Sequence, residues 1–156
     1  LSFFPEFDMG IKKLFLKQGW AGKTIGRSET IDQLNPIIRT MNLVMQCLGS
    51  LSASSSDADQ RVRIEAALRT HRMDIGKMCE TVFSCGGIAY SGTDLSPSDF
   101  ASASSEQYVQ LEAVLADQLE AEKKIEHQMR TRAILGVLEE NLRSRKNTLR
   151  NLTRHP

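Results

Sequence analysis

The sequence predicts an all-α protein, a four-helix bundle whose second and third helices are joined by a long crossover. Apolar residues recur every three or four positions along four separate stretches, which is the period of one buried helix face. The connections between these stretches are short, long and short, and the long one is the serine-rich segment 86–105. A long second connection lets the third helix start at the same end of the bundle as the second.

The first predicted helix covers residues 30–51. Its buried face holds Ile31, Leu34, Ile38, Met41, Met45 and Leu48. Thr30 with Gln33 has the form of a capping box. Because Pro36 lacks a backbone N–H, Asn35-Pro36 is an alternative helix start. Residues 49–57 are small and polar, and they predict a loop.

The second predicted helix covers residues 58–84 and ends at a left-handed Gly86-Gly87 cap. Its apolar face holds Ile64, Leu68, His71, Ile75, Met78, Val82 and Cys85. Segment 86–105 shows no helical or strand period. Fully extended it reaches about 60 Å, whereas a bundle helix is about 37 Å long, so it is long enough to cross the whole bundle.

The third and fourth predicted helices cover residues 106–128 and 132–152. The third places Tyr108, Leu111, Leu115, Gln118, Glu122, Ile125 and Met129 on one face, and the fourth Leu135, Leu138, Leu142, Arg145, Leu149 and Leu152. No Gly or Pro separates them, so a turn near 129–132 is predicted from the bundle topology. The alternative is a single long helix in an oligomeric coiled coil.

Residues 1–27 are predicted to be an amphipathic segment distinct from the bundle domain, 28–156. Its candidate partner-binding residues are Phe3, Phe4, Phe7, Ile11, Leu14, Phe15 and Trp20. Several of these share one face of a short helix, with Lys12, Lys13 and Lys17 mostly on the other. The segment either covers one end of the bundle or docks on a protein partner or a second copy; a membrane surface is less favoured.

Composition narrows the function classes. The 156 residues fit one domain, and a net charge of +1 gives no global field that favours nucleic acid. The basic residues between 143 and 154 lack interleaved aromatics and face an acidic third helix, which favours internal pairing over nucleic-acid binding.

An odd number of cysteines, Cys47, Cys79 and Cys85, without a C-x-x-C pair predicts free thiols and a cytoplasmic location. Because the chain begins at Leu1, the sequence leaves open whether a targeting segment has been removed.

Four stretches resemble the ferritin-like superfamily, especially its small bacterial stress-associated branch. They are TIDQLN at 30–35, VFSCGG at 82–87, LEAVL at 111–115 and RAILGVLEE at 132–140. The resemblance covers residues 30–152 and implies the fold and a stress-associated role. Di-iron members supply Glu from two helices and Glu-x-x-His from the other two. Here Leu68 stands three residues before His71, so no metal, cofactor or catalytic residue is carried over.

Four polar residues interrupt the apolar faces where the ligands of the family would lie: His71, Gln118, Glu122 and Arg145. We expect a central polar layer in which Glu122 or the Glu139/Glu140 pair neutralises Arg145, since an unpaired buried charge is strongly unfavourable. The alternative is that small helix rotations place these groups at the bundle edge, where long side chains reach water.

The sequence therefore predicts a non-catalytic interaction or structural protein that binds a protein partner or self-associates as a homo-oligomer. The competing class is a metal-binding or redox-active ferritin-like protein with an altered ligand set. The content of bound metal discriminates between the two.

Overall fold

The computed structural model describes residues 24–153, which form four α-helices and no strand. The elements are α2 (Arg27–Ser54), α3 (Ala58–Ser84), η1 (Pro97–Phe100), α4 (Ser105–Glu122), α5 (Met129–Thr148) and η2 (Arg150–Thr153), where η marks a short 3-10 helix. The all-α, four-helix prediction is confirmed. The predicted N-terminal amphipathic helix falls on residues 1–27, of which 1–23 lie outside the described part of the chain.

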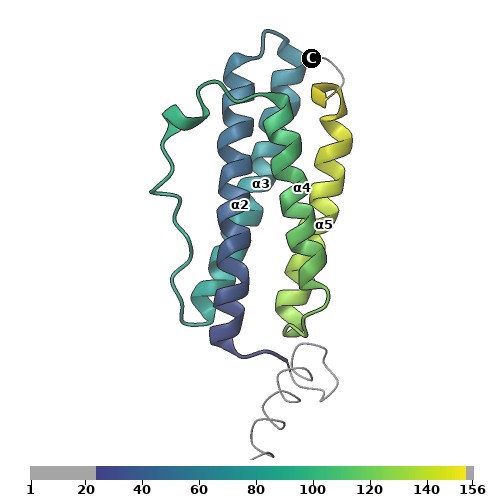
Figure 1. The fold of residues 1–156 in the computed structure, drawn as a ribbon. Helices are drawn as coiled ribbons and strands as arrows, with labels where there is room; N and C mark the ends of the chain where they lie inside the picture. The colour runs from purple at the N-terminus through teal and green to yellow at the C-terminus, as the bar shows by residue number, and fades with distance from the viewer. Residues whose placement is uncertain (1–23, 154–156) are drawn as a thin grey trace, which may run out of the picture.

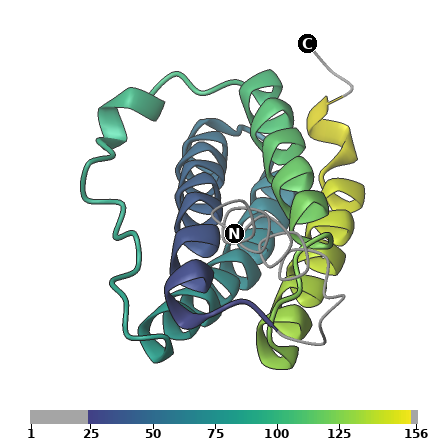
Figure 2. The same cartoon turned by 60° about the horizontal axis from the view of Figure 1, so that its bottom comes forward.

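The helices pack as a bundle in which α2 and α5 point one way and α3 and α4 the other (Figure 1). Both α3 and α4 pack against α2 and against α5, so α3 and α4 occupy opposite corners. The connection after α3 runs outside α2 to the far end of the bundle, where α4 begins (Figures 1 and 2). The third helix thus starts at the same end as the second, as the long connection predicts.

Each helix contributes one apolar face to a common core. Among the buried core residues are Leu34, Ile38, Val44 and Leu48 from α2, Ile64, Leu68, Met78 and Val82 from α3, Tyr108, Leu115 and Leu119 from α4, and Leu135, Leu138 and Leu142 from α5. Removing these apolar surfaces from water is the main force that holds the four helices together.

The buried face of α4 differs from the predicted one. It consists of Tyr108, Glu112, Leu115, Leu119 and Glu122, whereas the sequence placed Leu111 and Gln118 inward. Both sets have helical spacing, but they differ by a rotation of the helix. Leu111 packs at the edge of the core and the carboxylate of Glu112 points inward, for an electrostatic reason described below.

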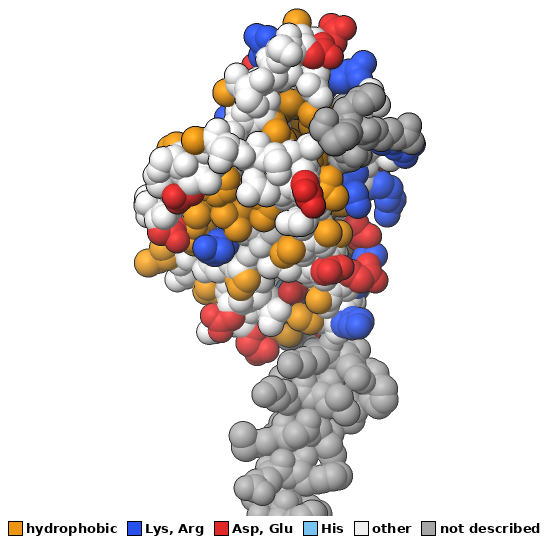
Figure 3. Space-filling model, turned by 45° about the horizontal axis from the view of Figure 1, so that its top comes forward, with side chains coloured by type: hydrophobic (Ala, Val, Ile, Leu, Met, Phe, Trp, Pro, Cys, Tyr) orange, Lys and Arg blue, Asp and Glu red, His pale blue; other side chains and the backbone are white. Residues whose placement is uncertain are grey.

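The long connection is fixed to α2 through Asn35. The side-chain amide of Asn35 donates to the carbonyl of Ile88 at 3.0 Å and accepts from the N–H of Tyr90 at 2.9 Å. Tyr90 and Phe100 pack against the core, and hydrophobic side chains gather next to the connection on the face in Figure 3. These contacts explain how a serine-rich segment without periodicity is held along the bundle.

The helix starts are partly mispredicted. α2 begins at Arg27, so Thr30 lies inside the helix and its hydroxyl donates to the carbonyl of Gly26 at 2.9 Å. Neither Thr30 nor Asn35-Pro36 is the helix start. A capping box forms instead at Ser104, which exchanges hydrogen bonds with Gln107. The predicted end of α3 is confirmed: Gly86 has a φ of 85°, the left-handed region that glycine tolerates.

The turn between α4 and α5 spans residues 123–128, not 129–132, and the single long helix is excluded. The turn needs no glycine or proline because other groups fix it. The carbonyl of Glu126 accepts from the N–H of Ile25 at 2.9 Å. Glu122 and His127 are joined by a buried hydrogen bond of 2.6 Å between Oε2 and Nε2.

Gly87 tests the packing of the connection. A Cβ built at Gly87 would lie 2.6 Å from the Ile31 side chain, so we expect Gly87→Ala to destabilise the fold by about 1–3 kcal/mol. Gly76→Ala, inside α3, is the matched control, because a Cβ added there meets no atom within 4 Å. We expect it to raise the free energy of unfolding by about 0.5–1 kcal/mol. Urea unfolding of both variants measures the difference. Equal effects of the two substitutions would contradict the packing shown here.

Candidate functional site

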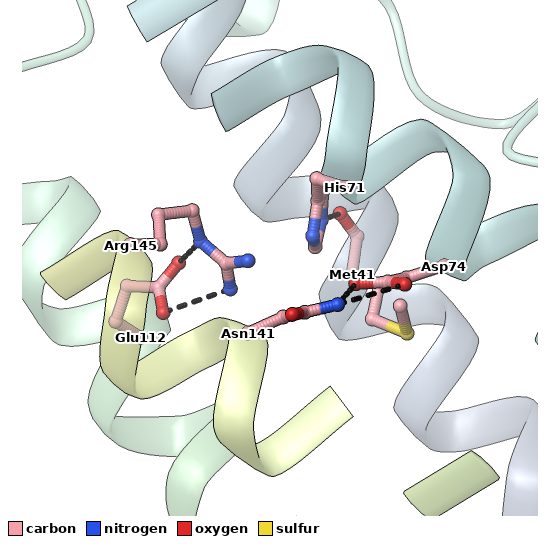
Figure 4. Close-up of polar contacts among 6 residues, drawn as sticks. All are labelled: Met41, His71, Asp74, Glu112, Asn141 and Arg145. Atoms are coloured by element: carbon pink, nitrogen blue, oxygen red, sulfur yellow. Dashed lines mark hydrogen bonds and ion pairs between the residues drawn. The ribbon is translucent and has the colours of Figure 1, made fainter. Parts of the chain in front are cut away.

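A buried ion pair occupies the centre of the bundle. Arg145 on α5 donates from Nε to Glu112 Oε1 at 2.8 Å and from Nη2 to Glu112 Oε2 at 3.0 Å (Figure 4). Glu112 is 0% exposed and Arg145 5%. Both positions continue the buried face of their helix, so forming the bundle forces both charges inside. The two-pronged geometry is the strongest that Arg and a carboxylate can form.

His71 on α3 faces the same interior layer and is 1% exposed. Its Nε2–H donates to the backbone carbonyl of Met41 on α2 at 2.7 Å. Burial lowers the pKa of His71 to about 4, and the positive charge of Arg145 acts in the same direction, while the bond to Met41 opposes it. His71 is therefore a neutral imidazole at neutral pH. The layer takes one group from each helix: Met41, His71, Glu112 and Arg145.

Asp74 and Asn141 form a second polar contact one helical turn away. Asn141 Nδ2 on α5 donates to Asp74 Oδ2 at 2.9 Å and to Oδ1 at 3.2 Å, and Asp74 is 2% exposed. This pair ties α3 to α5 and keeps a buried carboxylate hydrogen-bonded. Neither residue belongs to the polar layer that the sequence predicts. The available signal was spacing, since Asp74 follows His71 by three positions and Asn141 precedes Arg145 by four.

Tyr108 lies one helical turn before Glu112 and is 1% exposed. Burial raises the pKa of its hydroxyl, as does the negative charge of Glu112, and Arg145 acts in the opposite direction. The hydroxyl has no hydrogen-bond partner of ordinary geometry among the described residues. Burial also raises the pKa of Glu112, against the opposing charge of Arg145. Tyr108 therefore remains a neutral phenol beside the ion pair.

Two of the four residues predicted for the central layer lie elsewhere. Glu122 is at the end of α4, where it binds His127 and not Arg145. Gln118 is half-buried, and its amide approaches the Pro36 carbonyl at 3.5 Å. Glu139 pairs with Lys123 at 2.7 Å. The expected neutralisation of Arg145 by Glu122 or by the Glu139/Glu140 pair is wrong because the rotation of α4 presents Glu112 to Arg145.

The predicted partner-binding residues lie outside the described part of the chain, and the three cysteines are free as expected. The aromatic and aliphatic residues predicted to bind a partner, Phe3, Phe4, Phe7, Ile11, Leu14, Phe15 and Trp20, all fall within 1–23 and lie outside it. Cys47, Cys79 and Cys85 are free thiols, as predicted. Burial, followed by the nearby charge of Glu112, raises the pKa of Cys47 to about 11, so this thiol stays protonated.

The central layer is a structural ion pair that joins α4 to α5. Within residues 24–153 no three His, Cys, Asp or Glu side chains converge as a metal site would require. The Glu112 carboxylate is engaged by Arg145, whose positive charge opposes a cation in the same space. His71 Nε2 carries a proton that it donates to the Met41 carbonyl, so this nitrogen has no lone pair available for a metal ion.

No protein-family model, curated protein or solved structure matches this chain. In the described residues, no helix is both long enough and apolar enough to cross a membrane.

Because Arg145 and Glu112 form one buried ion pair, substitutions at the two residues should have strongly non-additive effects on the free energy of unfolding. Arg145→Met leaves Glu112 buried without its partner, so we expect a loss of about 3–5 kcal/mol. Adding Glu112→Leu removes the orphaned carboxylate, and the double variant should lose far less than the sum of the single losses. Urea unfolding of the three variants measures the coupling. Lys123→Ala is the control, since its exposed pairs should contribute below about 1 kcal/mol. Additive effects would show that Arg145 and Glu112 are independent.

The lowered pKa of His71 predicts that the stability of the fold decreases as the pH falls. Its pKa is lowered from 6.5 to about 4 by burial, so the unfolded chain takes up the proton first. The contribution of neutral His71 is complete above about pH 6.5 and is lost as the pH falls toward about 4, by an amount on the order of 3 kcal/mol. His71→Gln, which keeps a donor for Met41, should flatten this part of the stability profile. The same slope in both proteins would exclude His71 as its source.

Proposed function

We propose that the protein is a non-catalytic helical bundle that acts by associating with a protein partner or with further copies of itself. The observation that carries this proposal is the buried Arg145–Glu112 pair at the centre of the bundle. Its charged groups are engaged with each other, which is the state of a structural element and not of a site waiting for substrate.

The arrangement supports a ferritin-like ancestry in which an ion pair has replaced the metal layer. The parallel α3 and α4, joined by a crossover along the bundle, have the connectivity of that class (Figure 1). Arg145 supplies fixed positive charge in the layer where the resemblance places metal ions. A stress-associated role and a cytoplasmic location belong to this same proposal, since free thiols are typical of reducing compartments.

The N-terminal segment is the proposed binding element. Its sequence places Phe7, Ile11, Leu14 and Phe15 at helical spacing, which suits docking in an apolar groove. Ile25, near the end of this segment and within the described residues, is 2% exposed and hydrogen-bonded to Glu126 in the α4–α5 turn. The segment is therefore attached to the bundle at a fixed point, while the core of residues 24–153 is built from the four helices.

Deletion of residues 1–23 tests this proposal. We expect the shortened chain to keep its helicity and unfolding midpoint and to lose association that persists at high salt, because apolar docking is not screened. Circular dichroism and sedimentation velocity measure the two properties.

Replacing Phe7 and Phe15 with Asp should reproduce the loss in the full chain, and Lys12→Ala with Lys13→Ala is the matched control. Unchanged association after the deletion, or a bundle that no longer folds, would contradict a binding role for the segment.

A further inference from the structure

A basic groove lies between α2 and α3, with a volume of about 620 Å³. Arg61, Arg69 and Arg72 line it from α3, and the small residue Gly49 lies on the α2 side. Glu65 is also in the groove and accepts a weak hydrogen bond from Ser52 at 3.5 Å. The net charge along this lining is positive.

The three arginines of the groove are exposed, and none of their guanidinium groups pairs with another described residue. Lys123 and Arg132, two other exposed cations, do have carboxylate partners. Unpaired arginines gathered along one groove attract an acidic surface and accelerate its approach.

Helix α4 presents such an acidic surface. The helix contains Asp and Glu but neither Lys nor Arg. Glu106, Asp117 and Glu120 are exposed, and of these Glu120 also pairs with the exposed Lys123 at 2.9 Å. With helical spacing these three side chains follow one outer face. Because α3 and α4 occupy opposite corners of the bundle, the acidic face cannot reach the basic groove of its own molecule.

We propose that the basic groove between α2 and α3 binds the acidic face of α4 from a second copy of this chain. The surfaces have opposite charge, and the occupant is a helix laid along a groove between two helices. Gly49 leaves room for it: a Cβ built there meets no atom within 4 Å, so the fold itself does not require glycine.

This interface joins two different surfaces. Each bound copy keeps one free groove or one free acidic face, so the contact generates a ring or an open chain of copies. This interface uses the bundle surface and not residues 1–23, so it is distinct from the association proposed for the N-terminal segment. The two associations differ in salt dependence, which keeps their tests separate.

Charge reversal in the full chain tests the interface. One variant combines Arg69→Glu with Arg72→Glu, a second combines Asp117→Lys with Glu120→Lys, and a third carries all four changes. The control, Arg130→Glu with Lys124→Glu, reverses two exposed charges outside the groove. Sedimentation velocity at about 0.05 M and about 0.5 M salt isolates the association that is screened by ions.

We expect each two-residue reversal to weaken the low-salt association at least tenfold, by about 1.4 kcal/mol or more. The four-residue variant should restore it, because the signs of both surfaces are exchanged. Gly49→Gln should weaken it without lowering the unfolding midpoint. The control should behave like the intact chain.

The proposal is overturned by an intact chain that is monomeric at low salt, by reversals that leave association unchanged, or by a four-residue variant that fails to recover. If the groove instead holds a different acidic molecule, the α4 reversal will leave binding at the groove unaffected, which also overturns it. Association that is lost only when residues 1–23 are deleted supports the proposed function and contradicts this interface.

Discussion

The burial of the Arg145 charge is the constraint on which the rest of the bundle depends. A guanidinium group that is 5% exposed must face a carboxylate, and Glu112 provides one through two hydrogen bonds. To do so α4 turns Glu112 inward and moves Leu111 to the edge of the core. The same positive charge adds to burial in keeping His71 neutral, against the hydrogen bond to the Met41 carbonyl, which favours the protonated form.

The rotation of α4 also shapes its far end. With Leu115 and Leu119 inward, Glu122 is buried at the last position of the helix and reaches His127 across the turn. That bond lies next to the backbone hydrogen bond from Ile25 to Glu126. The central ion pair, the α4–α5 turn and the attachment of the N-terminal segment are thus linked through the orientation of one helix.

The sequence predicts the parts of the fold that depend on periodicity and on glycine. Four apolar faces, the Gly86 cap and the long crossover follow from patterns within single segments. The orientation of α4 does not, because the faces containing Leu111 or Glu112 both have helical spacing, and only the distant Arg145 decides between them. The α4–α5 turn was misplaced for a similar reason, since side chains and not Gly or Pro fix it. Of the predicted polar layer, His71 and Arg145 are central and Gln118 and Glu122 are not.

The buried Arg145–Glu112 pair at the centre of the bundle should exclude a metal ion from the space that the two side chains fill. Elemental analysis of the 156-residue chain, purified without chelators and after loading with Fe²⁺ or Mn²⁺, tests this exclusion. We predict that neither metal is retained in stoichiometric amount after gel filtration. Stoichiometric iron or manganese that is lost when His71 and Glu112 are replaced would contradict the account.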